Sequence, residues 1–284
     1  MNNTAKTIVR PLVDPLRTPV SWAFQHGVLP SYLRKFFPWW WVLEPFTLYG
    51  KEWKCRWYPT EFDDVGHEVF WSGFRKWEAE TVPVMMDHIR RSKCFIDVGA
   101  NCGIYTVLAA VINPNLRVVA IEPVPKVCAA LTRNVIQNNL GPRVTILNVA
   151  ASDANGTVDF HEAENTGMSS LAPNGYRSQA GKVIQVQCRT LDSIIAQLSI
   201  EPDFVKIDVE GFEDVVLSGA SRLLELRPRI VLEANPDGPC GRMTEMLTRS
   251  RYALHLITDN GPERRDAIIP VAEYRNWLCL PSGC

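Results

Sequence analysis

The sequence lacks any marked surplus of charge. Its 30 Lys and Arg residues balance 31 Asp and Glu residues, for a net charge of −1. A protein that binds nucleic acid through the phosphates carries a basic surplus, so we expect no nucleic-acid partner. A long apolar run is also missing. The aromatic stretch at 36–46, FFPWWWVLEPF, is shorter than the ~20 residues that span a bilayer, and we expect no transmembrane segment.

Two further absences concern the cellular compartment and metals. The opening residues, MNNTAKTIVR, lack the apolar core of a signal peptide. None of the eight cysteines forms a CxxC pair, which disfavours zinc. Isolated cysteines in apolar runs behave as small hydrophobic residues and persist as thiols in reducing compartments. We therefore expect a cytoplasmic protein without a bound metal.

Residues 1–75 are expected to form an aromatic-rich N-terminal extension or cap. Prolines interrupt any long helix in its first part. The alternating runs at 47–60 and 67–73 predict a small hairpin or meander. The aromatic stretch at 36–46 leaves four alternatives open: packing of the arm onto the main domain, a lid over an apolar substrate, a homodimer contact, for which the tryptophans at 39–41 are the candidates, or a membrane-surface anchor.

Residues 76–284 are expected to form the main domain. Apolar strand-like runs alternate there with helical patterns of 10–15 residues, which is typical of an α/β fold with a doubly wound, mostly parallel sheet. The expected strands are 94–98, 117–122, 144–149, 157–160, 183–188, 203–208, 229–233, 252–257 and 276–280. The expected helices are 77–91, 104–112, 125–139, 190–198, 211–225 and 240–250.

The glycine turn in CFIDVGANCG (94–103) follows the first of these strands and opens a helix. Ligands of such sheets bind outside the carboxyl ends of the strands. The turn lacks the dinucleotide fingerprint GxGxxG, since Asn101 stands where that motif has glycine. Asp97 would repel a pyrophosphate and attract an ammonium group. Glu122, at the end of the next strand, suits two ribose hydroxyls. This combination points to S-adenosylmethionine.

Five stretches in order resemble the FkbM-type methyltransferases, over about residues 77–280: FIDVGANCGIYT, IEP, NVAASDANGTVDF, TLDSI and DFVKIDVEGFEDVVLSGA. These are class I, S-adenosylmethionine-dependent enzymes, many of them O-methyltransferases of sugars and natural products. The resemblance implies a seven-stranded Rossmann-like methyltransferase sheet. It also implies three sets of cofactor-binding residues: Asp97, Gly99, Asn101 and Gly103 for the methionine part, Glu122 for the ribose, and Ala151 with Ser152 for the adenine.

Methyl transfer to a hydroxyl needs a group that removes the proton as the new bond forms. Lys206, Asp208 and Glu210 follow one another at alternate positions of KIDVE, so an extended chain would place them on one face. We predict Asp208 as general base or hydroxyl ligand, with Glu210 as second candidate. Lys206 would hold a carboxylate, either that of the substrate or that of Asp208. His161, before a long polar loop, is a further candidate base.

The function expected is O-methylation of a hydroxyl on a sugar, a glycan or a small natural product. Two alternatives stay open. One is a cofactor-binding scaffold without turnover. The other is a metal-assisted, catechol-type O-methyltransferase using Asp208, Glu233 and Asn235, although LEANP does not match the Asp-Asn pair of those enzymes. A nicotinamide oxidoreductase is disfavoured by the glycine turn. A nucleic-acid N-methyltransferase is disfavoured because KIDVEG replaces an NPPY-like element.

Overall fold

The structure is a computed structural model that describes residues 16–37, 42–162, 182–235 and 237–283. The chain divides into two compact units, Met1–Ala79 and Glu80–Cys284. Each unit is considered by itself. In the described residues, no helix is both long and apolar enough to cross a bilayer.

The first unit joins a helix, a hairpin and a second helix. The expected hairpin is present, with β1 paired antiparallel to β2. The run 67–73, expected as part of the hairpin or meander, is instead helical. Asp63 explains this, because its side chain accepts the N–H of Gly66 and caps the helix, while Val69 and Phe70 are fully buried. The bounds are α2 Arg17–Gln25, η2 Ser31–Phe36, β1 Phe46–Tyr49, β2 Lys54–Trp57 and α3 Asp64–Ser72.

Aromatic side chains pack inside this first unit. The rings of Phe24 and Trp71 meet edge to face at 5.1 Å, and Phe24 meets Phe37 in the same way at 5.6 Å. Such contacts bury much area per residue. The tryptophans at 39–41, the centre of the aromatic stretch for which the sequence leaves the dimer, lid and membrane-anchor alternatives open, lie outside the described residues.

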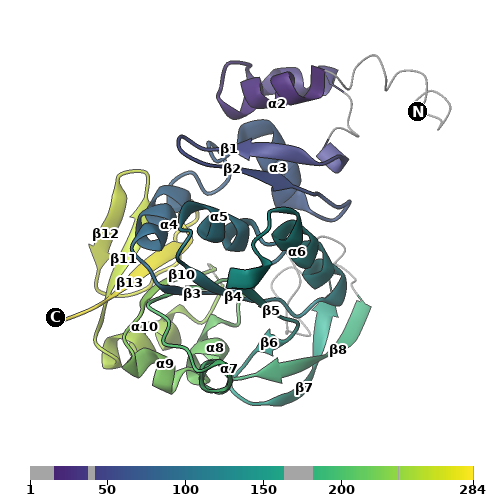
Figure 1. The fold of residues 1–284 in the computed structure, drawn as a ribbon. Coiled ribbons are helices and arrows are strands. Elements are labelled where there is room, and N and C mark those ends of the chain that lie inside the picture. Colours follow the sequence, from purple (N-terminus) through teal and green to yellow (C-terminus); the bar gives the residue numbers. More distant parts are fainter. Residues whose placement is uncertain (1–15, 38–41, 163–181, 236, 284) are drawn as a thin grey trace. The chain divides into compact units, whose positions relative to one another are not determined.

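The second unit contains a sheet of eight strands in the order β12-β11-β13-β10-β9-β3-β4-β5 (Figure 1). Seven of them are the strands expected for a methyltransferase sheet, and β12 adds an edge strand by pairing with β11. The strands from β10 to β5 are parallel, and β13 is antiparallel to both of its neighbours. The bounds are β3 Cys94–Val98, β4 Arg117–Ile121, β5 Val144–Leu147, β9 Phe204–Ile207, β10 Arg229–Glu233, β11 Tyr252–Thr258, β12 Gly261–Arg265 and β13 Asn276–Pro281.

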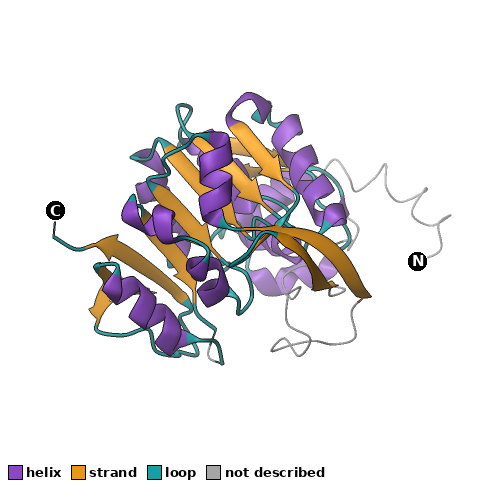
Figure 2. Ribbon diagram, turned by 90° about the horizontal axis from the view of Figure 1, so that it is seen from below, coloured by secondary structure: helices purple, strands orange, loops and turns teal. Residues whose placement is uncertain are grey.

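Helices cover both faces of this sheet (Figure 2), as the alternating sequence pattern predicted. The predicted helix 211–225 is divided in two around Gly219. A Cβ there would lie 2.1 Å from the carbonyl oxygen of Ser152, so the chain passes very close to another backbone at this point. The bounds are α4 Thr81–Arg90, α5 Ile104–Ile112, α6 Pro125–Gln137, η4 Gly141–Arg143, α7 Leu191–Leu198, α8 Glu213–Ser218, α9 Ser221–Glu225 and α10 Cys240–Arg249.

A separate three-stranded sheet, in the order β6-β8-β7, follows β5. Its strands are β6 Ala150–Ala151, β7 Gly156–Glu162 and β8 Lys182–Arg189. The polar loop expected between β7 and β8 falls on residues outside the described part of the chain, together with Met168, Ser169 and Ser170.

The strand order reverses between β3 and β9. From β3 the chain builds outward through β4 and β5, then returns to place β9 on the other side of β3. Ligands of open α/β sheets bind at the carboxyl ends of the strands beside such a reversal. Asp97 in β3 and Asp208 directly after β9 therefore flank the expected site.

Candidate active site

The glycine turn after β3 uses its backbone N–H groups internally. Each N–H from residue 99 to residue 103 donates to a partner within the protein. The acceptors are the carbonyl oxygen of Ile121 for Gly99 and Ala100, the Glu122 carboxylate for Asn101, the Asn101 side chain for Cys102, and the carbonyl oxygen of Ala100 for Gly103. A phosphate cradle needs free N–H groups. The turn is therefore not built as a phosphate cradle.

The two glycines of the turn are needed for packing within the protein. A Cβ at Gly99 would lie 1.8 Å from the carbonyl oxygen of Asp208, and one at Gly103 would lie 2.3 Å from Cδ1 of Leu131. Both residues also have positive φ, 78° and 94°. The backbone after β9 and the side chain of Leu131 in α6 therefore fill the space beside these glycines, and their contact with the methionine part of a cofactor stays a prediction.

Glu122 lies directly after β4 and is only 6% exposed. Its two carboxylate oxygens accept the N–H groups of Asn101 (3.0 Å) and Val124 (2.9 Å). Burial raises the pKa of this carboxyl to about 7, although the two N–H donors oppose the change. An ionised carboxylate has about four acceptor positions. Two hydroxyl donors could occupy the others, which is what a ribose offers.

Asp97 is buried more deeply than its predicted role suggests. It is 1% exposed, and its Oδ2 accepts the hydroxyl of Thr106 in α5 at 2.6 Å. Burial raises the pKa of this carboxyl, while the nearby charge of Lys206 lowers it. The structure thus shows Asp97 fixing the start of α5 against β3. Its contact with the methionine part of a cofactor stays a prediction.

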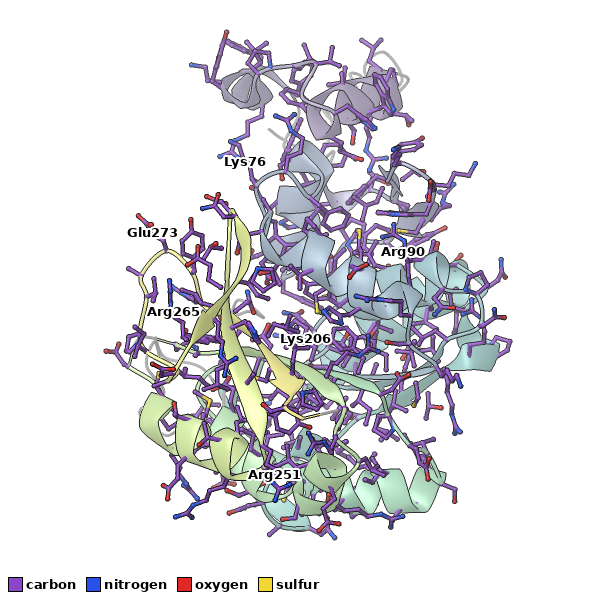
Figure 3. The ribbon with its side chains drawn as sticks, turned by 90° about the vertical axis from the view of Figure 1, so that its left-hand side faces the viewer. Lys76, Arg90, Lys206, Arg251, Arg265 and Glu273 are labelled. Carbon is purple, nitrogen blue, oxygen red and sulfur yellow. The ribbon has the colours of Figure 1, made fainter. Side chains whose placement is uncertain are left out.

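Lys206 in β9 is paired with Asp208. Its Nζ lies 2.6 Å from Oδ2 of Asp208, and its side chain is 3% exposed. Figure 3 shows Lys206 in the interior of the second unit. Of the two partners that the sequence left open for Lys206, the structure records Asp208. Burial would raise the pKa of Asp208, but the Lys206 ammonium, a hydrogen bond from Glu233 and the charge of Arg275 together hold it below its ordinary value of 3.8.

Asp208, Glu210 and Glu233 bring three carboxylates together. One oxygen of each lies within 4.8 Å of the others. Glu210 does not join Asp208 through the alternation of an extended strand, as the sequence predicted for KIDVE. It joins through a turn that ends the extended chain, in which Glu210 has a φ of 53°. Burial and the charges of Asp208 and Glu210 raise the pKa of Glu233 to about 10, so Glu233 is protonated at neutral pH. Oxygens in this arrangement could also hold a divalent cation.

Positive charge is already present around these carboxylates. Besides Lys206, Nη1 of Arg275 lies 3.8 Å from Oε1 of Glu233. The same Nη1 lies 3.5 Å from Oδ1 of Asn235, the third residue of the metal-assisted alternative. Lys206, Glu233 and Arg275 lower the pKa of Asp208, whereas burial and the acidic neighbours raise the pKa of Glu233. This pair of unlike carboxyl groups is typical of acid–base sites.

The remaining predicted residues lie on the three-stranded sheet and the turn after it. Ala151 in β6 and Ser152 after it are 5% and 6% exposed, and the N–H of Ser152 donates to the carbonyl oxygen of Arg189. His161 lies in β7, paired with Val183. Within the described residues, no contact joins His161 to the Asp208 cluster. Its role as a base, and those of Ala151 and Ser152 beside the adenine, stay predictions.

Sequence reasoning missed three residues that shape this site. Thr106 anchors Asp97, Arg275 reaches Glu233, and Glu213 binds the turn that follows Asp208. Glu213 could have been found from the local sequence, because an acid at the first position of a helix, directly after the turn, is favoured by the helix dipole. Arg275 is far away in sequence and had none.

The described geometry agrees with the comparisons with known proteins. The family model "Methyltransferase FkbM domain" matches residues 97–254, more than half of the chain. This chain belongs to the FkbM methyltransferase family. The match begins at Asp97 in β3 and ends in β11, so it contains the glycine turn, Glu122 and the Asp208 cluster.

Three curated relatives are similar over part of their length. The 2-O-methyltransferase NoeI of Sinorhizobium fredii is 28% identical, over 45% of this chain and 58% of its own. The hexuronic acid methyltransferase AglP of Haloferax volcanii is 23% identical, over 66% of this chain and 74% of its own. The 31-O-demethyl-FK506 methyltransferase FkbM of Streptomyces tacrolimicus is 28% identical, over 56% of this chain and 72% of its own.

Membership in this family makes S-adenosylmethionine the cofactor of the domain. One structural observation indicates that the residues present fit this cofactor. Glu122 is a buried carboxylate with two backbone donors, and its ionised form gains from two more. The turn at 99–103 has no N–H left for a pyrophosphate, which agrees with a cofactor that carries none.

Proposed function

We propose that this protein is an O-methyltransferase that methylates a hydroxyl group of a sugar, a glycan or a small natural product. The observation that carries the proposal is the Lys206–Asp208 pair, joined by Glu210 and Glu233 where the strand order reverses. The names of the three relatives support it, since they describe a 2-O-methyltransferase, a hexuronic acid methyltransferase and a 31-O-demethyl-FK506 methyltransferase.

In this proposal Asp208 accepts the proton of the acceptor hydroxyl. S-adenosylmethionine, when bound, supplies an electrophilic methyl group on a sulfonium. A hydroxyl oxygen is a poor nucleophile until its proton is removed. Asp208 is ionised at neutral pH because Lys206 lowers its pKa. The oxygen–hydrogen bond of the acceptor would break as its oxygen bonds to the methyl carbon, and the proton would move to a carboxylate oxygen of Asp208. The methyl carbon–sulfur bond would break in the same displacement and leave S-adenosylhomocysteine.

The neighbouring groups keep Asp208 in the required state. Lys206 fixes one carboxylate oxygen, and its own side chain is buried. Neutral Glu233 donates a hydrogen bond to the Asp208 carboxylate, which favours the ionised form of Asp208. Glu210 is half-buried, as Asp208 and Glu233 are, and is suited to bind a second hydroxyl of a polyhydroxylated acceptor.

The cofactor contacts belong to the same proposal. Glu122 binds the ribose hydroxyls, the turn with Asp97, Gly99, Asn101 and Gly103 receives the methionine part, and Ala151 with Ser152 borders the adenine. Residues 1–75 form an extension that precedes a methyltransferase domain at 76–284. A cytoplasmic location and a homodimer through the aromatic segment complete the proposal.

The test is a turnover assay with a methyl-labelled cofactor. Purified enzyme is incubated with trideuteromethyl S-adenosylmethionine and a panel of hexoses, hexuronic acids, oligosaccharides and macrolide alcohols, and the products are identified by mass spectrometry. We expect a labelled methyl ether with at least one acceptor, and at least ~100-fold slower transfer in Asp208→Asn. Cofactor binding without transfer to any acceptor would instead favour the scaffold alternative.

A further inference from the structure

The turn that carries Asp208 and Glu210 is held by a residue outside it. Glu213 is the first residue of α8, and its side chain folds back toward the end of β9. Its Oε1 accepts the N–H of Val209 and the N–H of Gly211, both at 3.1 Å. One carboxylate oxygen therefore binds the backbone on each side of Glu210.

The burial of Glu213 is costly for a residue with only this structural contact. It is 0% exposed, and its Oε2 has no hydrogen-bond partner in the part of the chain that the structure describes. Burial raises the pKa of Glu213 to about 7, and the charge of Asp208 adds to the effect. An unpartnered buried oxygen is destabilising. A hydroxyl or amide side chain could cap the same helix at lower cost.

The turn itself needs such a support. Glu210 and Gly211 have φ values of 53° and 98°, and a non-glycine residue in the left-handed region is strained. Strained residues persist where the surroundings fix them, and they concentrate at functional sites. On its other side the turn abuts Gly99 in the glycine turn after β3, since a Cβ at Gly99 would lie 1.8 Å from the Asp208 carbonyl oxygen. A loosened turn would therefore move Asp208 relative to Gly99.

We propose that Glu213 is the positioning residue of this active site, whose carboxylate fixes the turn at 208–211 so that Asp208 and Glu210 converge with Glu233. This rests on the proposed O-methyltransferase function. Glu213 does not touch the reacting atoms and acts only through the turn. Small displacements of a reacting group are enough to reduce catalysis strongly, so the effect of losing Glu213 is expected on kcat.

The chain offers a matched control in Asp192 of α7. Its carboxylate also accepts two backbone N–H groups, those of Arg222 and Leu223, both at 3.0 Å, at the start of α9. Asp192→Ala removes the same kind of contact from a helix start that carries none of the site residues. Glu213→Ala removes the support of the turn, and Glu213→Gln keeps an oxygen acceptor of the same shape.

The experiment measures kcat and KM with the best acceptor of the panel, S-adenosylhomocysteine affinity by calorimetry, and amide hydrogen exchange at Val209 and Gly211. For Glu213→Ala we expect a ~100-fold lower kcat, a less than ~3-fold change in affinity, and faster exchange at both amides. Glu213→Gln should recover kcat to within ~10-fold of wild type, and Asp192→Ala should retain it within ~2-fold.

Three results would overturn the proposal: wild-type kcat in folded Glu213→Ala, equal losses in Glu213→Ala and Asp192→Ala, or equal losses of kcat and affinity. If Glu213→Ala does not fold, Glu213→Gln decides the question. A kcat and an amide exchange unchanged from wild type would support the role of Glu213 as acceptor. A ~100-fold loss of kcat in Glu213→Gln would refute it. If wild-type enzyme methylates nothing, the O-methyltransferase function fails. Hydrogen exchange then still decides whether Glu213 holds the turn.

Discussion

Replacing Glu122 by Gln tests the electrostatics of the predicted ribose site. Burial raises the pKa of Glu122 from an ordinary value of 4.5 to about 7. The folded state therefore keeps a proton that the unfolded state releases between these values, so this residue lowers stability as the pH rises through that range. Each pKa unit corresponds to about 1.4 kcal/mol, and the full effect above pH 7 is about 3 kcal/mol.

The substitution has a second, pH-independent effect of opposite sign. Glu122 accepts two backbone N–H groups, and Gln can satisfy only one of them with its oxygen. The unsatisfied donor costs about 1–3 kcal/mol. We therefore expect Glu122→Gln to be less stable than wild type at pH 5 and nearly equal to it at pH 8.5.

Urea unfolding at the two pH values measures this difference. The control is Glu201→Gln, at an exposed position, which should leave the pH dependence unchanged. If the stability difference between Glu122→Gln and wild type is the same at pH 5 and pH 8.5, the reasoning about the buried charge is refuted.

Three further predictions concern the catalytic cluster and the glycine turn. Lys206→Met should raise the pKa of Asp208 and move the acid limb of the pH–rate profile to higher pH; an unmoved limb would show that Lys206 does not control Asp208. Treatment with EDTA should leave turnover within ~2-fold, because Lys206 already supplies the positive charge; a loss restored by Mg²⁺ would favour the metal-assisted alternative. Gly99→Ala should lower the free energy of unfolding by more than ~3 kcal/mol, measured by urea titration, since its Cβ would overlap the Asp208 backbone; a well-folded variant of wild-type stability would contradict that packing.

The ends of the strands could be predicted from the sequence, because each strand ends where its run of apolar residues ends. Parallel strands covered on both faces are continuous apolar runs, and an acid or glycine at the end of each is visible in the sequence. Asp97, Glu122 and Asp208 were located in this way. The added strand β12 had no such signal, because GPERR is polar and pairs only at an edge of the sheet.

Other features depend on tertiary contacts that the sequence does not show. Residues 67–73 alternate like a strand, but Asp63 caps a helix there. The role of Gly99 depends on how closely β9 approaches β3. Glu210 joins the cluster through a left-handed turn, and Arg275 reaches Glu233 from a segment far along the chain. Each of these needs the arrangement of two distant segments to be known.

Calorimetric titration with S-adenosylhomocysteine tests the central claim most directly, because it needs no acceptor. The account predicts one-to-one binding, weakened ~100-fold in Glu122→Gln through loss of two charge-assisted hydrogen bonds to the ribose, and nearly unchanged in Asp208→Asn. Absence of binding by wild-type protein at millimolar ligand would contradict the cofactor site. Full-affinity binding by Glu122→Gln would contradict the assignment of the ribose to Glu122.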